Sequence, residues 1–327
     1  MRTFTFKGLF LTVLFVLLGS LAIQAADDGL ITRQVTLKLD EAGTLPNMIS
    51  YYHKNLITNL KIVGKINGTD LKFIREMAGR DYYGYKTDGK LSILDLSEAK
   101  IVAGGDAYVR YSDNKYTSND KLGDYVFYDC RGLTSLTLPS GVTSIGIAAF
   151  EGCNGLTSLT LPSSVTSIGG HAFEGCSGLT SLAIPSSVTS IGDYVFYDCS
   201  GLTSLTLPSS VTEIGWGAFR GCSGLTSIYV YPENLPELGI DIFTGCDAKN
   251  CTVYVPKGTY DAYKSSEFGY FEKIVEFDAT GIDKVTTSTN AKEVSRYSVN
   301  GQRLVGPTKG LNIVKYSDGS VKKVAVE

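Results

Sequence analysis

A repeat of 23 residues fills the middle of the chain and constrains the fold more than any other feature. Three residue types keep this spacing, with one step of 24 at the end: Phe127, Phe150, Phe173, Phe196, Phe219 and Phe243; Cys130, Cys153, Cys176, Cys199, Cys222 and Cys246; Pro139, Pro162, Pro185, Pro208 and Pro232. One unit buries roughly eight apolar side chains, too few to offset the entropy of ordering its backbone. The units must therefore stack on one another, as in a solenoid.

Each unit contains two spacings. Leu156, Leu159 and Leu161 are spaced as in a short strand, and Pro162 ends that strand because proline cannot donate to a ladder. The apolar side chains over 168–176 have the one-sided spacing of a short helical turn. We therefore predict an α/β solenoid of short parallel strands and short helical turns, with the recurring phenylalanines and cysteines in its core.

The unit also carries a family resemblance. Its L-x-x-L-x-L-P, I-G and A-F-x-x-C elements resemble the BspA-type, or Treponema-type, leucine-rich repeat of bacterial surface proteins over 123–246. The resemblance implies a leucine-rich-repeat solenoid and an adhesin-like role toward host proteins or other bacteria. The commoner leucine-rich pattern has asparagine after the strand, whereas this chain has Gly141 and Thr143, or Ser164 and Thr166, so we expect no asparagine ladder.

The N-terminal 25 residues have the features of a signal peptide. Arg2 and Lys7 precede an apolar run over 9–23, and small residues follow at Ala25 and Ala26. A membrane span needs about 20 apolar residues, more than this run supplies. We expect residues 1–25 to be removed and the protein to be exported, to the extracellular space or the outer cell surface rather than the periplasm, without a membrane span.

The remaining segments divide into three predicted parts. Residues 26–90 are expected to form a helical N-terminal cap, in which Leu71, Ile74 and Met77 lie on one helix face and Thr69 or Asp70 is the N-cap. Residues 91–276 are assigned to the solenoid and its closing cap. They include an insertion over 103–121 without apolar periodicity, which favours a functional or mobile loop.

Residues 277–327 are expected to be a linker and a small β domain. Asn300-Gly301 and Asp318-Gly319 are typical of two-residue hairpin turns. The segment resembles a C-terminal domain common on secreted proteins of the Bacteroidetes, related to sorting domains. A stable β appendage without a sorting role is the alternative.

The residue pattern indicates no enzyme, cofactor or metal site. The two histidines, His53 and His171, lie in unrelated contexts, and the motifs of nucleophile elbows, zinc proteases and phosphate loops are absent. With 30 basic against 33 acidic residues and no basic cluster, nucleic acid is not an expected partner. The aligned cysteines favour buried free thiols. A disulfide, with Cys246 and Cys251 as the first pair to consider, or a metal site is the alternative.

Recognition is therefore expected on the outer surface. The chain has 20 tyrosines, and they crowd two polar segments, 82–85 and 108–116. Tyrosine offers a large amphipathic face at low entropic cost. The candidate ligand-binding residues are Tyr108, Arg110, Tyr111, Tyr116, Trp216 and Arg220. Ordinary packing is the alternative for each cluster. A ladder of outward Ser and Thr, such as Ser158 and Thr160, either binds sugars or merely suits exposed strands.

These observations predict a secreted or cell-surface binding protein. Its expected partner is a protein or glycan on host or bacterial surfaces, by resemblance. A structural spacer or surface component that binds copies of itself is the alternative, which the near-identical repeats favour.

Overall fold

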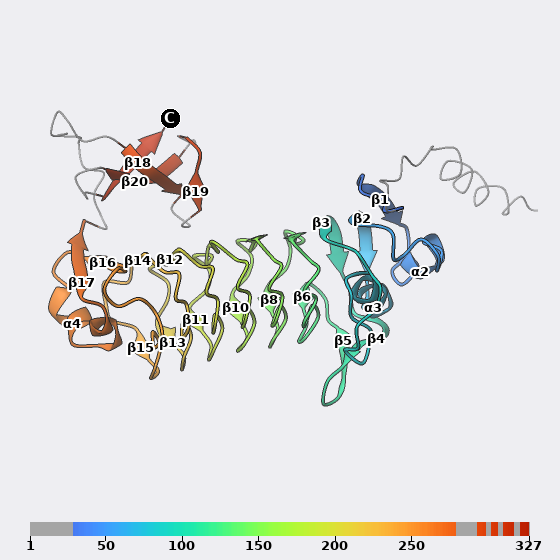
Figure 1. Cartoon of the computed structure of the whole chain (residues 1–327), viewed down its shortest axis with the longest axis horizontal. Coiled ribbons are helices and arrows are strands. Elements are labelled where there is room, and N and C mark those ends of the chain that lie inside the picture. Colours follow the sequence, from blue (N-terminus) through green and yellow to red (C-terminus); the bar gives the residue numbers. More distant parts are fainter. Residues whose placement is uncertain (1–28, 279–292, 299–301, 307–309, 317–320, 327) are drawn as a thin grey trace, which may run out of the picture.

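The computed structural model describes residues 29–278, 293–298, 302–306, 310–316 and 321–326. The predicted signal peptide, most of the predicted linker and both predicted hairpin turns lie outside the described residues. The described chain winds into an elongated solenoid (Figure 1). Among the described residues, no helix has the length and apolar character that crossing a membrane requires.

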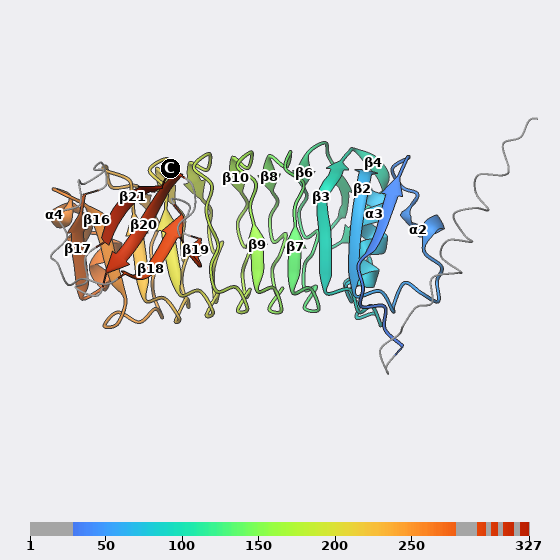
Figure 2. The ribbon, with the colours of Figure 1, turned by 90° about the horizontal axis from the view of Figure 1, so that it is seen from above.

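Two parallel sheets form one side of the solenoid, here called the long-strand face (Figure 2). The first has the order β1 (Val35–Leu39), β2 (Asn59–Ile66), β3 (Ile93–Ile101), β7 (Ser135–Thr137) and β9 (Ser158–Thr160). The second has the order β12 (Ser204–Leu207), β14 (Ser227–Val230), β16 (Thr252–Pro256) and β17 (Lys273–Phe277). Leu136 pairs with Leu159, one repeat later, so each repeat is one turn of the coil. The prediction of a leucine-rich-repeat solenoid with rungs of about 23 residues is confirmed.

Two-residue strands form a second side, the short-strand face. They are β6 (Lys121–Leu122), β8 (Ser144–Ile145), β10 (Ser167–Ile168), β11 (Ser190–Ile191), β13 (Glu213–Ile214) and β15 (Glu237–Leu238). All of their pairings are parallel, and the strands follow one another along the solenoid (Figure 1). A glycine follows each strand, as Gly146 follows β8 and Gly169 follows β10.

The third side, the turn face, differs in detail from the expected helical turns. Cys130 N donates to Phe127 O at 3.0 Å within the rung, and Phe127 N donates to Ala149 O of the next rung at 2.8 Å. The residues two before and two after each phenylalanine have positive φ, namely Tyr125, Asp129, Ala148, Gly152, His171, Gly175, Tyr194, Asp198, Gly217, Gly221, Asp241 and Gly245. Left-handed residues interrupt an α-helix. The segment is therefore a chain of turns whose amides also join neighbouring rungs.

The core contains the recurring phenylalanines and cysteines in two files. The six phenylalanines are at most 1% exposed, and consecutive rings lie 5.3–5.9 Å apart, tilted by no more than 15°. All seven cysteines are buried free thiols. From Cys153 to Cys246, each recurring thiol donates to the phenylalanine carbonyl of the preceding rung at 3.0–3.3 Å. This bond gives each buried sulfur a polar partner, a carbonyl that also accepts from the cysteine N–H of its own rung.

The N-terminal segment is more than the helical cap expected for it. Strands β1 and β2 extend the long-strand sheet, so the coil begins before the recognisable repeat. Helix α2 (Leu45–Met48) precedes β2, and helix α3 (Gly68–Met77) follows it. The N-cap is Asn67 rather than Thr69 or Asp70: its side chain accepts from Thr69 N at 3.0 Å, and Asp70 Oδ2 accepts from Asn67 N at 2.9 Å.

The insertion over 103–121 forms an antiparallel hairpin. It contains β4 (Gly104–Arg110) and β5 (Asn114–Thr117). Strand β4 lies against α3, and Asp106 N donates to Thr69 Oγ1 at 2.9 Å. The hairpin is therefore anchored to the N-terminal helix and projects beside the first rungs (Figure 1).

Two elements complete the C-terminal end. Helix α4 (Tyr260–Lys264) and the 3-10 helix η1 (Glu267–Tyr270) close the core, where Phe268 and Phe271 each lie 5.0 Å from the Phe243 ring. A separate antiparallel sheet has the order β19 (Arg303–Leu304), β18 (Glu293–Ser298), β20 (Gly310–Tyr316) and β21 (Val321–Val326). It lies over the end of the long-strand face (Figure 1), where Tyr297 contacts Tyr229 at 6.3 Å between ring centroids. The exact domain boundaries stay a prediction.

The ladders on two faces of the described solenoid are interrupted at one rung, 180–192: on the long-strand face no strand lies between β9 and β12, and on the short-strand face β10 and β11 do not pair. Corner amides elsewhere donate to the preceding rung, as Thr157 N does to Thr134 O at 3.0 Å and Thr203 N to Thr180 O at 3.1 Å. No such bond joins Thr180 N to the rung before it within the described residues, and β9 and β10 have no paired strand on their C-terminal side. The turn face remains joined, since Phe173 N donates to Val195 O at 2.9 Å. This position is called the rung joint below.

Candidate binding surface

The two tyrosine-rich segments meet beside the first rungs. Arg110 N donates to Tyr82 O at 2.9 Å, and the Tyr82 hydroxyl donates to Asn114 Oδ1 at 2.5 Å. Arg80 Nε donates to Asp129 O at 2.9 Å, which ties the 80–85 segment to the first full rung. Residues that are separate in sequence therefore form one surface, here called the tyrosine patch: Tyr82, Tyr83, Tyr85, Tyr111, Tyr125 and Tyr128.

The rings of the patch pack on one another while presenting area to solvent. Tyr111 stacks on Tyr125 with centroids 4.3 Å apart and planes 13° apart, and it meets the edge of Tyr128 at 5.6 Å. Tyr83 lies 4.8 Å from Tyr82 and 6.3 Å from Tyr85. Tyr83, Tyr85 and Tyr111 are 57–72% exposed. The patch is preorganised, because the rings already restrict one another's rotamers.

The local backbone explains how the patch is held. Asp81 Oδ1 accepts from Tyr83 N at 2.9 Å and from Tyr85 N at 2.8 Å, which fixes the turn that presents these rings. Cations lie over two of the rings: Lys72 Nζ is 5.2 Å from the Tyr82 centroid, and Lys115 Nζ is 5.8 Å from that of Tyr125. Such contacts add modest cation–π stabilisation.

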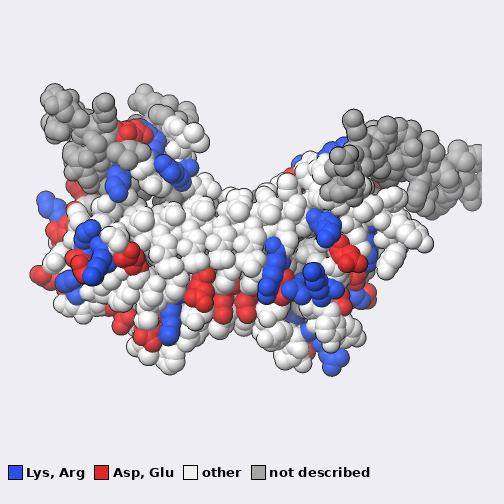
Figure 3. All heavy atoms as spheres, in the orientation of Figure 1, with Lys and Arg blue, Asp and Glu red and all other residues white. Residues whose placement is uncertain are grey.

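The turn face continues from the patch along the solenoid. Burial raises the pKa of the Glu151 carboxyl, and Glu174 raises it further, while His171 opposes the rise. His171 Nδ1 lies 2.6 Å from Glu174 Oε2, and its ring stacks on Tyr194 at 5.1 Å. Within 132–192, Glu151 and Glu174 are the only charged side chains of the sequence. Figure 3 accordingly shows basic and acidic groups gathered toward the two ends, with acidic groups along the lower edge of the middle.

Two hollows lie on the short-strand face. One of about 390 Å³ lies under the hairpin and is lined by residues of β6, β8 and β10 together with Lys115 and Tyr116. The other, of about 200 Å³, is lined by Trp216, Asp193, Glu213 and Glu237. Both are bordered by the glycines that follow the short strands. The two hollows share no lining residue. The strip of the short-strand face that contains both, from Lys121 to Glu237, is called the short-strand groove below.

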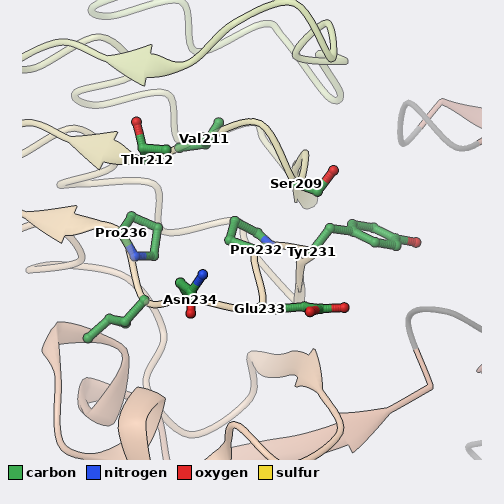
Figure 4. A pocket seen from close by; sticks show the side chains of 9 residues that line it. Ser209, Val211, Thr212, Tyr231, Pro232, Glu233, Asn234 and Pro236 are labelled. Carbon is green, nitrogen blue, oxygen red and sulfur yellow. The ribbon is translucent and has the colours of Figure 1, made fainter.

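A third hollow, of about 470 Å³, lies between two loops of the last full rungs (Figure 4). Its lining includes Pro232, Pro236, Asn234 and Glu233, from the rung that has 24 residues instead of 23. In Figure 4 the Tyr231 side chain points away from the other lining residues. Glu233 is the one titratable carboxyl among the lining residues, so this hollow offers no set of acid, base and nucleophile.

The structure places the predicted binding residues on different surfaces. Tyr111 belongs to the tyrosine patch, and Arg110 is exposed beside it. Tyr116, which is 58% exposed, and Trp216, which is 56% exposed, line the short-strand groove instead. Arg220 lies on the turn face, where its guanidinium is 3.6 Å from Asp241 Oδ2.

Tyr108 requires a correction. It is not an exposed recognition residue: it is 1% exposed, its hydroxyl donates to Asp124 O at 2.9 Å, and it supports the hairpin from beneath the hollow that it borders. Burial raises the pKa of its phenol. Sequence reasoning also left Tyr125 and Tyr128 out of the candidate set. Their signal was available, because both occupy rung positions whose residue type varies from rung to rung.

A column of threonines beside the outward hydroxyl ladder, one residue before its serines, has a structural use at the corners. The Thr157 hydroxyl donates to Thr134 O at 3.1 Å, and the Thr226 hydroxyl to Thr203 O at 3.0 Å. These side chains therefore join rungs. No group of three or more His, Cys, Asp or Glu side chains that could hold a metal ion occurs among the described residues.

Comparisons with known proteins place the repeat in a family. No curated protein matches the chain. A Treponema pallidum leucine-rich repeat protein is 29% identical, over 48% of this chain and 79% of that one, with a TM-score of 0.35. The pneumococcal vaccine antigen PcpA is 16% identical, over 75% and 68%, with a TM-score of 0.41. A leucine-rich repeat protein of Bacteroides ovatus is 22% identical, over 52% and 67%, with a TM-score of 0.24.

The coiled geometry and the repeat spacing agree with the match to a family model. The model of the BspA type leucine rich repeat region matches residues 120–250 in six copies. Residues 120–250 are therefore a leucine-rich repeat region of the BspA type.

Proposed function

We propose that the chain is an exported binding module that takes a protein partner on its tyrosine patch. One observation carries the proposal: two tyrosine-rich segments, separate in sequence, form a single preorganised and exposed aromatic surface. Tyrosine is enriched at protein interfaces and at their energetic centres. Leucine-rich repeat regions generally serve as binding modules rather than enzymes, which supports the same reading.

The N-terminal segment supports export. The charged and then apolar segment over 1–25 is typical of a secretory signal. An exported module of this kind would meet proteins of host tissue or of other bacteria, as adhesins do. Glycans are the other class of surface ligand, and the hydroxyl-rich middle of the long-strand face would be their natural site.

The test is capture of an immobilised protein by the full chain. The probes are purified host extracellular-matrix proteins and bacterial surface proteins. Binding to at least one of them should weaken at least tenfold in Tyr83→Ser and in Tyr111→Ser, because each removes an exposed ring from the patch. Tyr52→Ser is the matched control, since Tyr52 is an 85% exposed tyrosine outside the patch.

Two results would overturn the proposal. One is a panel on which nothing binds above background. The other is an equal loss in Tyr52→Ser. A further result would change the identity of the partner. If light scattering shows concentration-dependent assembly and Tyr111→Ser abolishes it, the partner is a second copy of this chain, as in the spacer function.

A further inference from the structure

The short-strand groove has charged ends and an uncharged middle. At one end Lys121 is exposed, and within the described residues no carboxylate lies within ion-pair distance of it. At the other end Asp193, Glu213 and Glu237 are exposed and line the same hollow. Between them the strands place Ser144, Ser167 and Ser190 at the equivalent positions. At the first position of the short strands, the middle rungs therefore have a serine hydroxyl where the end rungs have a charged side chain.

The acidic end is also built around an aromatic ring. Trp216 N donates to Asp193 Oδ1 at 2.7 Å, which fixes the backbone that carries the indole. The ring lies over Gly239, where a Cβ atom would come within 2.4 Å of Trp216 Cδ1. Glu213 and Glu237 are in register on adjacent parallel strands. Within the described part of the chain, none of the three carboxylates has a Lys or Arg at ion-pair distance.

We propose that the short-strand groove binds an extended polypeptide segment, with a Lys or Arg side chain of that segment lying on Trp216 among Asp193, Glu213 and Glu237. An indole face attracts a cation, and desolvation by a bound chain strengthens that attraction. Carboxylates beside the ring supply charge-assisted hydrogen bonds to the same cation. The inference rests on the proposed protein-binding function but uses a different face from the tyrosine patch.

The geometry also sets the length of the bound segment. Lys121 and Glu213 are four rungs apart, about 19 Å at the usual spacing of paired strands. An extended chain rises about 3.3 Å per residue, so roughly six residues cover that distance. The fitting segment carries its basic residue at one end and an Asp or Glu, placed for Lys121, about six residues away.

The sole tryptophan of the chain provides a direct readout, because only Trp216 emits indole fluorescence. The probe is a synthetic seven-residue peptide with Lys at one terminus, Glu at the other and alternating Gly and Ser between them, made in both directions. The full chain should show a saturable change in Trp216 emission with one of the two peptides. The same peptide with acetylated lysine should produce no change, and raising the salt concentration should weaken binding.

Variants distinguish the groove from general electrostatics. Glu213→Gln and Glu237→Gln should each raise the Kd of the peptide at least fivefold. Glu272→Gln, which changes an exposed carboxylate between η1 and β17, should leave the Kd unchanged. Lys121→Gln should raise the Kd for the seven-residue peptide but not for a peptide with Lys and Glu separated by one residue. The inference is overturned if the acetylated peptide gives the same response, or if Glu272→Gln matches Glu213→Gln.

The tyrosine patch serves as the independent reference. Tyr111→Ser should leave the Trp216 titration unchanged, because the patch is on another face. If Tyr111→Ser loses protein capture and the peptides do not change Trp216 emission, the patch is supported and the groove is overturned. If Tyr111→Ser keeps protein capture and a peptide changes Trp216 emission, the patch is overturned and the groove is supported.

Discussion

The glycine after four of the short strands, at Gly146, Gly169, Gly215 and Gly239, sets how closely two rungs can approach. A Cβ on Gly169 would lie 2.7 Å from Ile147 N and 2.8 Å from Gly146 C, both backbone atoms of the preceding rung. Neither atom can move without separating the rungs. The neighbouring Gly170 is different, since a Cβ there would meet only Asp193 O at 3.2 Å, and other rungs have Ile147, Asp193 or Trp216 at this position.

This contrast gives a prediction with a control one residue away. Gly169→Ala should lower the free energy of unfolding by about 2 kcal/mol or more, because overpacking forces the backbone to shift. Gly170→Ala should change it by less than about 0.5 kcal/mol. Urea titration followed by far-UV circular dichroism measures both. Equal losses would contradict the assignment of Gly169 to the contact between rungs.

The phenylalanine file gives a second prediction for single residues. Phe173 is fully buried between the rings of Phe150 and Phe196, at 5.3 and 5.4 Å. Phe173→Ala should cost about 3–5 kcal/mol because it opens a cavity in a core that cannot collapse without unstacking. Ser181→Ala, an outward position on the long-strand face, should be nearly neutral. Thermal unfolding compares the two, and similar midpoints would show that the faces are misassigned.

The recurring cysteines can be treated as one unit because their thiols share the same buried environment. Burial raises the pKa of Cys130 to about 11 and that of Cys199 to about 12, and burial likewise raises the pKa of Cys153, Cys176 and Cys222. An unfolded thiol ionises near pH 8.5. Above that pH the unfolded chain releases protons that the folded chain retains, so the unfolded state gains stability.

The thiol contribution to stability should therefore be constant below about pH 8 and fall as the pH rises toward 11. The loss is at most about 1.4 kcal/mol per pH unit for each thiol. Urea unfolding at pH 7, 8, 9 and 10 measures it. In the same range iodoacetamide should label the native thiols only as fast as the chain opens. Rapid labelling of the native chain at pH 8.5, or stability that does not change up to pH 10, would contradict the buried free thiols.

The long strands could be predicted because leucine alternation and a closing proline have one structural meaning. The turn face could not, since apolar side chains at these spacings fit a helical turn and a chain of turns equally well. The deciding fact is positive φ at ordinary residues such as Tyr125 and His171, which composition does not reveal. Strands β1 and β2 were missed because their residues do not repeat the later rungs.

The residue types of the candidate surfaces could be predicted from the sequence, but their positions in the fold could not. The two tyrosine segments stood out in the sequence, yet it is the folded chain that unites them, through the bonds from Arg110 N to Tyr82 O and from the Tyr82 hydroxyl to Asn114 Oδ1. Tyr108 has the same local composition as Tyr111 but faces the core. Trp216 gained its carboxylate neighbours from adjacent rungs, 23 and 21 residues away along the chain in the case of Asp193 and Glu237. Such neighbours arise because the rungs stack, so the sequence pattern alone does not identify them.

At the scale of the whole molecule, the rung joint divides the solenoid into two halves. The tyrosine patch and Lys121 belong to the half that contains β1 to β10, whereas Trp216 follows β13 in the half that contains β11 to β17. The C-terminal sheet lies beside this second half (Figure 1). On the long-strand face the joint has Ala183, where the neighbouring rungs have Thr160 and Thr206. Alanine suits a strand less well than threonine. The turn face holds the halves together, so opening at the joint would change the curvature of the coil and the distance between the ends of the groove.

Hydrogen exchange tests this division with controls that the repeat itself supplies. The amides of Thr180, Thr189 and Gly192 have no ladder bond to the preceding rung, whereas their equivalents Thr157, Thr166 and Gly169 donate at 2.9–3.0 Å. Losing one such bond corresponds to about 1 kcal/mol of local stability, or roughly fivefold to tenfold in exchange rate. The first three amides should therefore exchange at least fivefold faster than the second three, although their sequence surroundings are nearly identical. Equal exchange rates for the two sets of amides would mean that the solenoid bends as one piece. The length of peptide that fits the groove would then be fixed. Faster exchange at the joint, slowed when the peptide bridges Lys121 and Trp216, would show that a ligand bound across both halves sets the curvature.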